Sequence, residues 1–203
     1  MLAHYMKDEG YVRTVTEGSS KDGTDVHTVN QRAAGLSTRD SAKTFIYAFL
    51  YGAGDAKIGS IIGGTSKDGA KLKEKFLKQT PALAKLIQRV SKQAAKGWVP
   101  GLDGRRIWVR SEHAALNSLL QGAGAIVMKK ALVLAYYRLK KERVWFKLVA
   151  SVHDEYQFET KPEFADTLGN IVRESIIEAG KQFNLRCPLD GEYKTGKSWR
   201  HTH

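Results

Sequence analysis

The sequence contains a single cysteine, Cys187, which excludes an internal disulfide and any metal site built from several cysteines. Cys187 lies beside Leu185 and Pro188, which favours a small buried residue over a nucleophile. No apolar run approaches the roughly 20 residues of a membrane span. The N-terminus also lacks the charged-then-apolar plan of a secretory signal. These absences predict a cytoplasmic-type chain with no membrane partner.

Acidic residues are the scarcer charge, since 21 Asp and Glu stand against 33 Lys and Arg and leave a formal net charge of +12. An excess of this size favours a polyanionic partner, and nucleic acid is the first candidate. A solvated basic surface is the alternative that charge alone leaves open. The chain has 203 residues, 42% of them hydrophobic and 27% charged. That suffices for one sizeable core, or for a small domain with an added lobe.

The segment Thr38–Gly52 has the pattern of a helix with an apolar face and a second face of cations and aromatic rings. Apolar residues recur at i, i+3, i+4, i+7, i+8 and i+11, the spacing of a face that packs on a core. These residues are Ala42, Phe45, Ile46, Phe49, Leu50 and Ala53. Two cations and two aromatic rings recur every four residues along another side. They are Arg39, Lys43, Tyr47 and Tyr51. Cations suit a polyphosphate, and rings suit a sugar and a base.

Capping residues and periodicity place further elements along the chain. Asp25 is the expected N-cap of a short helix that Gly35 ends, and Pro81 is expected to open a later helix. Further helical patterns cover 67–78, 81–96, 113–143 and 162–183. Alternation predicts strands at 106–110, 147–152 and 156–159, a loop at 97–104 and an extended stretch at 190–194. The first 24 residues are mixed and end in a loop. Helices followed by a small antiparallel sheet among long helices indicate an α+β fold.

The predicted hairpin in the second half carries two adjacent carboxylates, Asp154 and Glu155, at its tip. Adjacent acids at an apolar tip repel one another unless a cation lies between them. Mg²⁺ is the economical candidate, because it takes one or two carboxylates together with phosphate oxygens. An ordinary polar β-turn is the alternative, because short motifs often match by chance. His153, taken alone, favours a structural role.

The long helix expected from 113 to 143 begins with a polar row, in which His113, Asn117 and Gln121 are spaced four residues apart. Amide side chains in such a row can read the acceptors of a duplex minor groove, and the small residues 122–125 allow a close backbone approach. A solvated helix face is the alternative. Arg105 likewise suits either a phosphate contact or plain surface.

Three segments of the sequence, taken in order, resemble the motifs of family A DNA polymerases, the DNA polymerase I class. They are R-x-x-x-K-x-x-x-Y-x-x-x-Y-G, the Asn/Gln helix and V-H-D-E. They look most like the replicative polymerases of short-tailed phages. The resemblance runs from L-A-H-Y-M through D-V-H-T, L-Y-G-A-G-D-A-K-I-G and L-D-G-R to the C-terminal His203. It implies helical fingers plus part of a palm, with a small antiparallel sheet flanked by long helices. Residues 1–15 would be a remnant of the first palm segment, 16–112 the fingers and 113–203 the C-terminal palm.

The resemblance also implies roles in template-directed nucleotidyl transfer from a dNTP to a primer 3′-hydroxyl during DNA replication. Arg39 and Lys43 would bind the β- and γ-phosphates, and Lys43 would also act as general acid for the departing pyrophosphate. Tyr47 would lie against the sugar and triphosphate, and Tyr51 would stack near the templating base. His27 would lie near the triphosphate.

The remaining implied roles concern metal and DNA. Asp154 would bind Mg²⁺ in a two-metal site, with Glu155 assisting it. The primer–template contacts would come from His113, Asn117, Gln121 and Arg105.

One element of the family pattern is missing from the sequence. In the family, a D-x-S-x-x-E-x-R segment comes almost directly before the L-A-H-x-M match, which here is already Leu2–Met6. The palm aspartate and steric-gate glutamate of that segment are therefore expected to lie off this chain, together with the thumb and any exonuclease domain. Nucleotidyl transfer by two metal ions requires carboxylates from both palm strands. We therefore expect the isolated chain to be inactive without the missing N-terminal polymerase portion.

Three origins fit such a chain: a split-gene product, a truncated reading frame or an excised piece. If the chain is phage-encoded, we expect it in the cytoplasm of the bacterial host. Two alternative functions remain at this point. One is a non-catalytic module that binds DNA or nucleotide. The other is a fragment of a phage-type single-subunit RNA polymerase, which shares a similar helix and His-Asp hairpin. Tyr47 and Glu155 favour the DNA enzyme.

Overall fold

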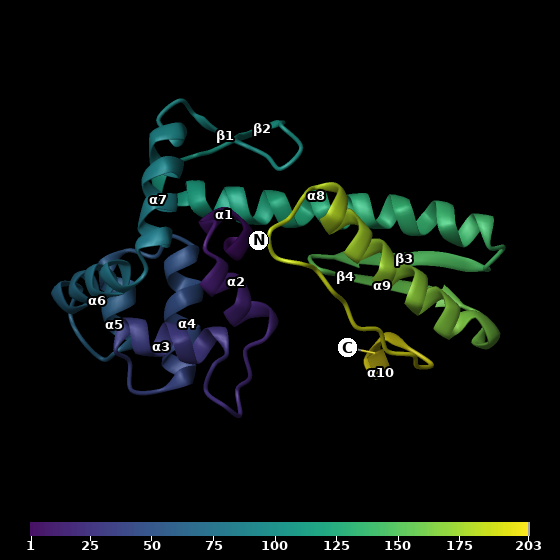
Figure 1. Cartoon of the computed structure of the whole chain (residues 1–203), viewed down its shortest axis with the longest axis horizontal. Helices are drawn as coiled ribbons and strands as arrows, with labels where there is room; N and C mark the ends of the chain where they lie inside the picture. Colours follow the sequence, from purple (N-terminus) through teal and green to yellow (C-terminus); the bar gives the residue numbers. More distant parts are fainter. Residues whose placement is uncertain (203) are drawn as a thin grey trace. The chain divides into compact units, whose positions relative to one another are not determined.

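The computed structural model describes residues 1–202 and divides into two compact units, Met1–Gln121 and Gly122–His203. His203, the last point of the family resemblance, lies outside the described residues. The described part combines helices with two separate two-stranded antiparallel sheets (Figure 1). The predicted α+β class is therefore confirmed. The expected division into a palm remnant, fingers and C-terminal palm stays a prediction, because compact units and polymerase subdomains need not share boundaries.

The first unit opens with seven helices. They are α1 (Leu2–Met6), α2 (Glu9–Thr16), α3 (Val26–Ala34), α4 (Arg39–Leu50), α5 (Asp55–Ile61), α6 (Ser66–Gln79) and α7 (Pro81–Ala94). Local chemistry sets their ends: Thr38 accepts from the Ser41 amide to cap α4, and Gly35 ends α3 in the left-handed region. The helices α3, α4, α6 and α7 confirm the sequence predictions. The helices α1 and α2 were not predicted, since the first 24 residues showed no clear period, and the short helix α5 was not predicted either.

The core of the first unit is built from the apolar faces of these helices. Phe45 of α4 and Phe76 of α6 are fully buried, with ring centroids 5.1 Å apart in an edge-to-face arrangement. Ala42 and Ile46 are buried beside Phe45, as the helical spacing predicted, and Phe49 is partly buried against the same core. The apolar face of α4 is thus fixed to the core, and its polar face is left at the surface.

A short hairpin follows α7, with β1 (Trp98–Pro100) paired antiparallel to β2 (Arg106–Trp108). The prediction of a loop over Gly97–Gly104 was wrong for residues 98–100, and the strand predicted at 106–110 ends at Trp108. Val99 is buried in the core of the first unit. Residues 98–100 are extended because they pair with β2, and the burial of Val99 packs this hairpin against the core.

The long helix α8 (Glu112–Lys141) begins in the first unit and continues in the second. By length and composition it is the one helix among residues 1–202 that could cross a membrane, with a mean hydropathy of 1.4 over 18 residues, although 33% of that window is buried. This corrects the expectation that no stretch is long and apolar enough. We assign α8 to the cores instead, because Leu119 is buried in the first unit's core and Leu139 in the second's.

The second unit packs a hairpin between helices. Its elements after α8 are β3 (Phe146–Val152), β4 (Glu155–Thr160), the 3-10 turn η1 (Pro162–Phe164), α9 (Ala165–Gln182) and α10 (Trp199–Thr202). β3 and β4 pair antiparallel with Val152 opposite Glu155, and Figure 1 shows α9 running beside this hairpin. Leu139, Val144, Leu168 and Ile171 form the unit's buried cluster. The two strands and the helix predicted from Pro162 are confirmed.

Two smaller predictions concern the C-terminal region. Cys187 is buried, as its apolar neighbours indicated. The stretch predicted as extended at 190–194 forms no strand. Asp190 instead pairs with Arg173 of α9, at 2.7 Å between Oδ1 and Nε. This ion pair attaches the stretch to α9 without a partner strand.

Candidate nucleotide-binding face

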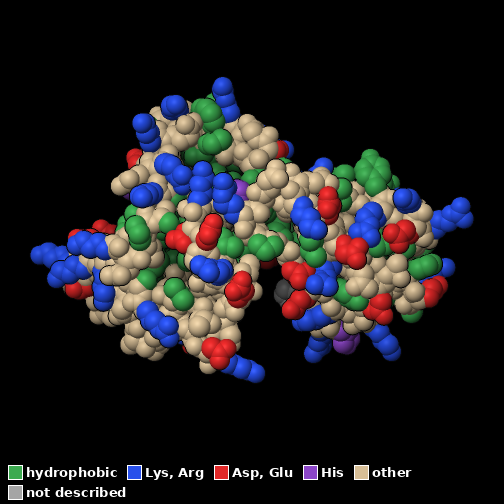
Figure 2. All heavy atoms as spheres, in the orientation of Figure 1, with side chains coloured by type: hydrophobic (Ala, Val, Ile, Leu, Met, Phe, Trp, Pro, Cys, Tyr) green, Lys and Arg blue, Asp and Glu red, His purple; other side chains and the backbone are tan. Residues whose placement is uncertain are grey.

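The polar face of α4 lies at the surface of the first unit. Arg39, Lys43, Tyr47 and Tyr51 are all exposed, with Tyr47 at 49% and Tyr51 at 59%. Because α4 is regular from Arg39 to Leu50, the four-residue spacing places these side chains in one row. The predicted face of two cations followed by two rings is therefore present. We call these four residues the α4 row. Figure 2 shows that Lys and Arg side chains are dense over the part of the surface where α6 and α7 lie.

The first cation of the α4 row is held by a carboxylate from α3. Asp25 accepts from Arg39 Nη2 at 2.9 Å and from Arg39 Nε at 3.2 Å, both through Oδ1. Asp25 also caps α3, because its Oδ1 accepts from the His27 amide at 3.1 Å, and its Oδ2 accepts from the Thr28 hydroxyl. The Arg39 guanidinium, followed by these other donors, holds the pKa of the Asp25 carboxyl well below its ordinary range.

His27 adds a third ring beside the two tyrosines of the α4 row. Its ring centroid lies 6.3 Å from that of Tyr47, and its Nδ1 is buried without a partner among residues 1–202. Burial lowers the pKa of His27 below its ordinary value, and the charges of Arg39 and Lys43 lower it further, against an opposing effect of Asp25. The structure therefore brings His27 and the α4 row together, although they come from two helices.

The last ring of the α4 row is joined to the start of α8. Gln121 Nε2 donates to the Tyr51 hydroxyl at 3.1 Å. The next residue, Gly52, has φ of 79°, and a Cβ there would lie 2.5 Å from the backbone oxygen of His113. Only glycine fits such a backbone position. The two polar segments predicted separately, on α4 and on α8, thus meet in the first unit.

The other residues expected to contact DNA lie in less specific surroundings. His113 is exposed and Asn117 is half-buried, on the same side of α8 as Gln121. Arg105 lies in the loop of the β1–β2 hairpin, where its guanidinium pairs with Asp103 at 2.6 Å. An arginine whose carboxylate partner is a near neighbour in the loop is also an ordinary surface feature.

The tip of the β3–β4 hairpin places the two predicted carboxylates in different settings. His153 has φ of 51° in the turn, and Asp154 beside it is exposed. Glu155 is half-buried, and its Oε1 accepts from Trp199 Nε1 at 3.1 Å and from the side-chain Nε2 of Gln157. The sequence did not predict that α10 would bind at this tip. Asp154 is therefore presented to solvent, and Glu155 is held within the second unit.

The donor set at this tip fits only part of a divalent metal site. Mg²⁺ accepts one or two carboxylates and completes its octahedron with water or phosphate oxygens. Asp154 and Glu155 are adjacent oxygen donors of the right kind. Within residues 1–202, however, no three His, Cys, Asp or Glu side chains come together in a way that could hold a metal ion.

Some contacts of the candidate site could not be predicted from the sequence. The Asp25–Arg39 pair joins residues 14 apart and the Tyr51–Gln121 pair joins residues 70 apart. Asp25 was predicted as a helix cap, and that prediction is confirmed, but its second role needs the packing of α3 on α4. The sequence held one signal for the Asp25–Arg39 pair. An arginine in the first turn of a helix is unfavourable in the field of the helix dipole, and a nearby carboxylate offsets this cost.

Residues 1–201 match the family model described as DNA polymerase family A. The chain is 42% identical over 227 residues to the DNA-directed DNA polymerase of Escherichia phage T7, covering 100% of this chain and 31% of that protein. It is 44% identical over 186 residues to that of Escherichia phage Phieco32, covering 88% and 30%. It is 27% identical over 215 residues to DNA polymerase I of Geobacillus stearothermophilus, covering 98% and 24%.

A solved structure shows the same fold. The POL domain of Pol1 from M. smegmatis, solved with DNA primer-template and dNTP, matches with a TM-score of 0.78 at 23% identity. The match covers 93% of this chain and 36% of that one. The chain thus spans about a third or less of the length of the relatives that it matches.

Proposed function

Because the chain belongs to DNA polymerase family A, we propose that it is part of a DNA-directed DNA polymerase and that the α4 row binds the incoming dNTP. The reaction is nucleotidyl transfer, in which the primer 3′-hydroxyl attacks the α-phosphate, the bond to the β-phosphate breaks and pyrophosphate leaves. The observation that supports this proposal is the meeting of His27 with the α4 row. Two cations, an imidazole and two rings on one surface suit a triphosphate, a sugar and a base.

Each residue of this face has a proposed role. Arg39 and Lys43 bind the β- and γ-phosphates through charge-assisted hydrogen bonds. Lys43 has no carboxylate partner among residues 1–202, so its ammonium is available to donate a proton to the departing pyrophosphate. Tyr47 lies against the sugar and triphosphate beside His27. Tyr51 stacks near the templating base.

We propose that the primer–template lies along the first turns of α8. His113, Asn117 and Gln121 donate to minor-groove acceptors, which every base pair presents, so these contacts test duplex geometry rather than sequence. The Gln121–Tyr51 hydrogen bond supports this placement, because it joins a duplex-reading residue to the ring next to the template. Arg105 contacts a backbone phosphate.

For the metal, we propose that Asp154 is a ligand of Mg²⁺ and that Glu155 assists it. A bound Mg²⁺ would neutralise charge on the triphosphate and lower the pKa of the primer hydroxyl. The described residues supply only part of its ligand set. The further carboxylates would come from the rest of a family A polymerase, because this chain covers only about 31% of its phage relatives.

The expected partner is therefore the remaining polymerase portion, together with primer–template DNA and dNTP, in the cytoplasm of a bacterial host. A non-catalytic module that binds DNA or nucleotide is the second candidate, favoured by the absence of a metal-binding group within residues 1–202. The third, a single-subunit RNA polymerase fragment, is not supported by the family match or by the relatives' names.

A complementation assay tests the proposed function. The chain is mixed with the preceding portion of a phage relative's polymerase, and extension of a labelled primer is followed on a gel. We expect extension only in the mixture, and we expect Asp154→Asn to abolish it. Asp22→Asn, in a loop of the first unit, is the control and should leave extension unchanged. Extension that survives Asp154→Asn would overturn the metal assignment, and extension by the isolated chain would overturn the need for a partner.

A further inference from the structure

The short helix α10 is attached to the tip of the β3–β4 hairpin by side-chain hydrogen bonds. Trp199 Nε1 donates to Glu155 Oε1 at 3.1 Å, and the Thr202 hydroxyl donates to Gln157 Oε1 at 3.2 Å. Because Glu155 and Gln157 are two residues apart on β4, their side chains lie on the same face of the strand. This face meets α10. The helix therefore contacts β4 directly beside Asp154, the residue proposed to bind the metal.

The contacts of α10 converge on one oxygen of Glu155. Gln157 Nε2 also donates to Glu155 Oε1, so two side-chain donors meet at that atom. Thr202 sets the direction of the Gln157 amide, because its hydroxyl donates to the amide oxygen and leaves the amide nitrogen turned toward Glu155. The same hydroxyl lies 3.1 Å from the carbonyl oxygen of Trp199. We call Trp199, Gln157 and Thr202 the Glu155 clamp.

The opposite face of β4 is held by α8. Tyr156 lies between the two clamped residues, and its hydroxyl donates to the carbonyl oxygen of Met128 in α8. Phe158, on the same face as Tyr156, packs against the buried cluster of the second unit. The strand is thus fixed from its α8 side. What the Glu155 clamp adds is the orientation of one carboxylate, because charge-assisted hydrogen bonds to a carboxylate are strong and directional.

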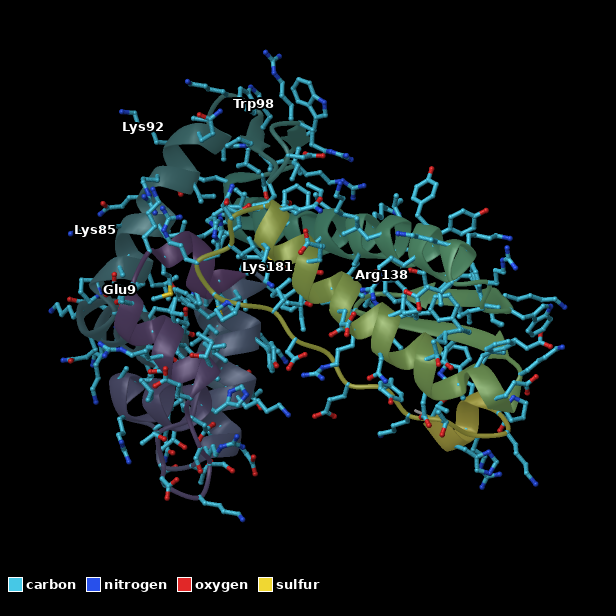
Figure 3. All side chains as sticks on the ribbon, turned by 45° about the vertical axis from the view of Figure 1, so that its right-hand side comes forward. Glu9, Lys85, Lys92, Trp98, Arg138 and Lys181 are labelled. Atoms are coloured by element: carbon cyan, nitrogen blue, oxygen red, sulfur yellow. The ribbon has the colours of Figure 1, made fainter. Side chains whose placement is uncertain are left out.

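A strap of extended chain, residues 188–198, carries α10 to the hairpin tip. Figures 1 and 3 show this strap in yellow, running back alongside α9 to α10. Asp190 accepts from Arg173 of α9 at 2.7 Å and 2.8 Å. The Tyr193 ring lies so close to α9 that a Cβ on Gly169 would be 2.4 Å from it, an approach that only glycine allows. The strap therefore has a fixed register on α9, which sets where α10 meets β4.

We propose that the Glu155 clamp positions the Glu155 carboxylate so that it assists Asp154 in binding a divalent metal. Trp199, Gln157 and Thr202 act through Glu155 and are positioning residues. The inference rests on the proposed metal role of Asp154 and Glu155 and adds the side chains that prepare it. Hydrogen-bond partners of a ligating carboxylate contribute about 10- to 100-fold in metal affinity. We expect the lower end of this range, because Trp199 is 48% exposed.

The clamp is tested with Mn²⁺ and the full chain by NMR, without catalysis. Mn²⁺ prefers the same oxygen ligands as Mg²⁺, and at a fixed concentration below saturation the paramagnetic relaxation of the Asp154 amide proton is proportional to the bound fraction. Trp199→Phe keeps a ring and removes the N–H donor, and we expect it to reduce this relaxation about 10-fold. Trp145→Phe, at another exposed indole of the second unit, is the matched control and should behave as the wild type does.

A second pair of variants tests the hydroxyl of the clamp and carries the test if Trp199→Phe does not fold. Thr202→Val keeps the side-chain volume and removes the donor to Gln157, so it should reduce the relaxation about 2- to 10-fold, the range for one neutral hydrogen bond. Thr202→Ser keeps the hydroxyl and should restore the wild-type value. Urea midpoints of the same variants measure stability separately, because a purely structural α10 would change stability and leave the Mn²⁺ effect unchanged.

Unchanged relaxation in both Trp199→Phe and Thr202→Val would overturn the inference, whatever their urea midpoints. Asp154→Asn scores the proposed function in the same measurement. If Asp154→Asn removes the relaxation while the clamp variants keep it, the metal assignment stands and only the clamp is wrong. If Asp154→Asn keeps the relaxation, or if the wild type shows none, the metal assignment is wrong and the clamp falls with it.

Discussion

Asp25 and Arg39 connect the start of α3 to the start of α4 through one carboxylate, which accepts from Arg39 Nη2 at 2.9 Å while it caps α3. The same carboxylate therefore fixes a helix end and the position of a phosphate-binding candidate. A guanidinium held in this way loses less side-chain entropy when an anion binds than a free one would. The pair thus links the stability of the first unit to the geometry of the α4 row.

Substitutions at Asp25 should separate its two roles. Asp25→Ala removes both the cap and the partner of Arg39, and we expect it to lower the free energy of unfolding by about 1–2 kcal/mol. Asp25→Asn keeps a side-chain oxygen for the cap and removes only the charge, so it should cost less than Asp25→Ala. Urea titrations of the two variants measure the difference. Equal losses would show that the cap contributes nothing.

The pKa of His27 should report the arrival of a triphosphate. Burial and the charges of Arg39 and Lys43 lower this pKa below 6.5 in the free chain, so the ring is neutral at pH 7. A nearby triphosphate favours the charged ring and raises the pKa. By linkage, dNTP binding should take up a proton and strengthen as the pH falls toward the free-chain pKa. An NMR titration of the ring with and without dNTP checks this, and an unchanged pKa would place the triphosphate elsewhere.

Gly52 should tolerate no side chain. Its φ is 79° and a Cβ would lie 2.5 Å from the backbone oxygen of His113, so Gly52→Ala combines left-handed strain with a backbone clash. We expect a loss of about 2 kcal/mol or more in unfolding free energy. Gly63→Ala is the control, because its φ is 67° and a Cβ there meets nothing within 4 Å. It should show the strain alone, about 1 kcal/mol. Equal losses at both positions would mean that the contact with His113 has no effect.

Acid should weaken the attachment of the C-terminal stretch to α9. Hydrogen bonds from Arg173 and the Gly191 amide lower the pKa of Asp190 from 3.8 to about 2. Because the folded pKa lies below the unfolded one, the contribution to stability is complete above about pH 4 and is lost as the pH falls toward 2. Asp190→Asn and Arg173→Gln should each remove this acid dependence from urea midpoints, and the double variant should add nothing further. Additive losses would exclude a coupled pair.

The sequence predicted those parts of the fold and site that depend on local periodicity. Thr38 followed by a 3.6-residue pattern predicted α4 and its exposed row, and Asp25 and Gly35 predicted both ends of α3. The three-residue strand β1 could not be predicted, because Gly97, Gly101 and the proline between them are typical of a loop, whereas the strand depends on pairing with β2. Contacts such as Tyr51 with Gln121 depend on packing across 70 residues. The family resemblance is confirmed, and the residue roles stay predictions.

The central claim, that the α4 row binds the incoming nucleotide, is tested most directly by titrating a fluorescent dNTP into the chain. Lys43→Gln should weaken binding about 10- to 100-fold, the range for loss of a charge-assisted hydrogen bond. Lys57→Gln, at an exposed position of α5, removes the same charge outside the row and should bind as the wild type does. Equal dNTP affinity of the wild type and Lys43→Gln would contradict the claim.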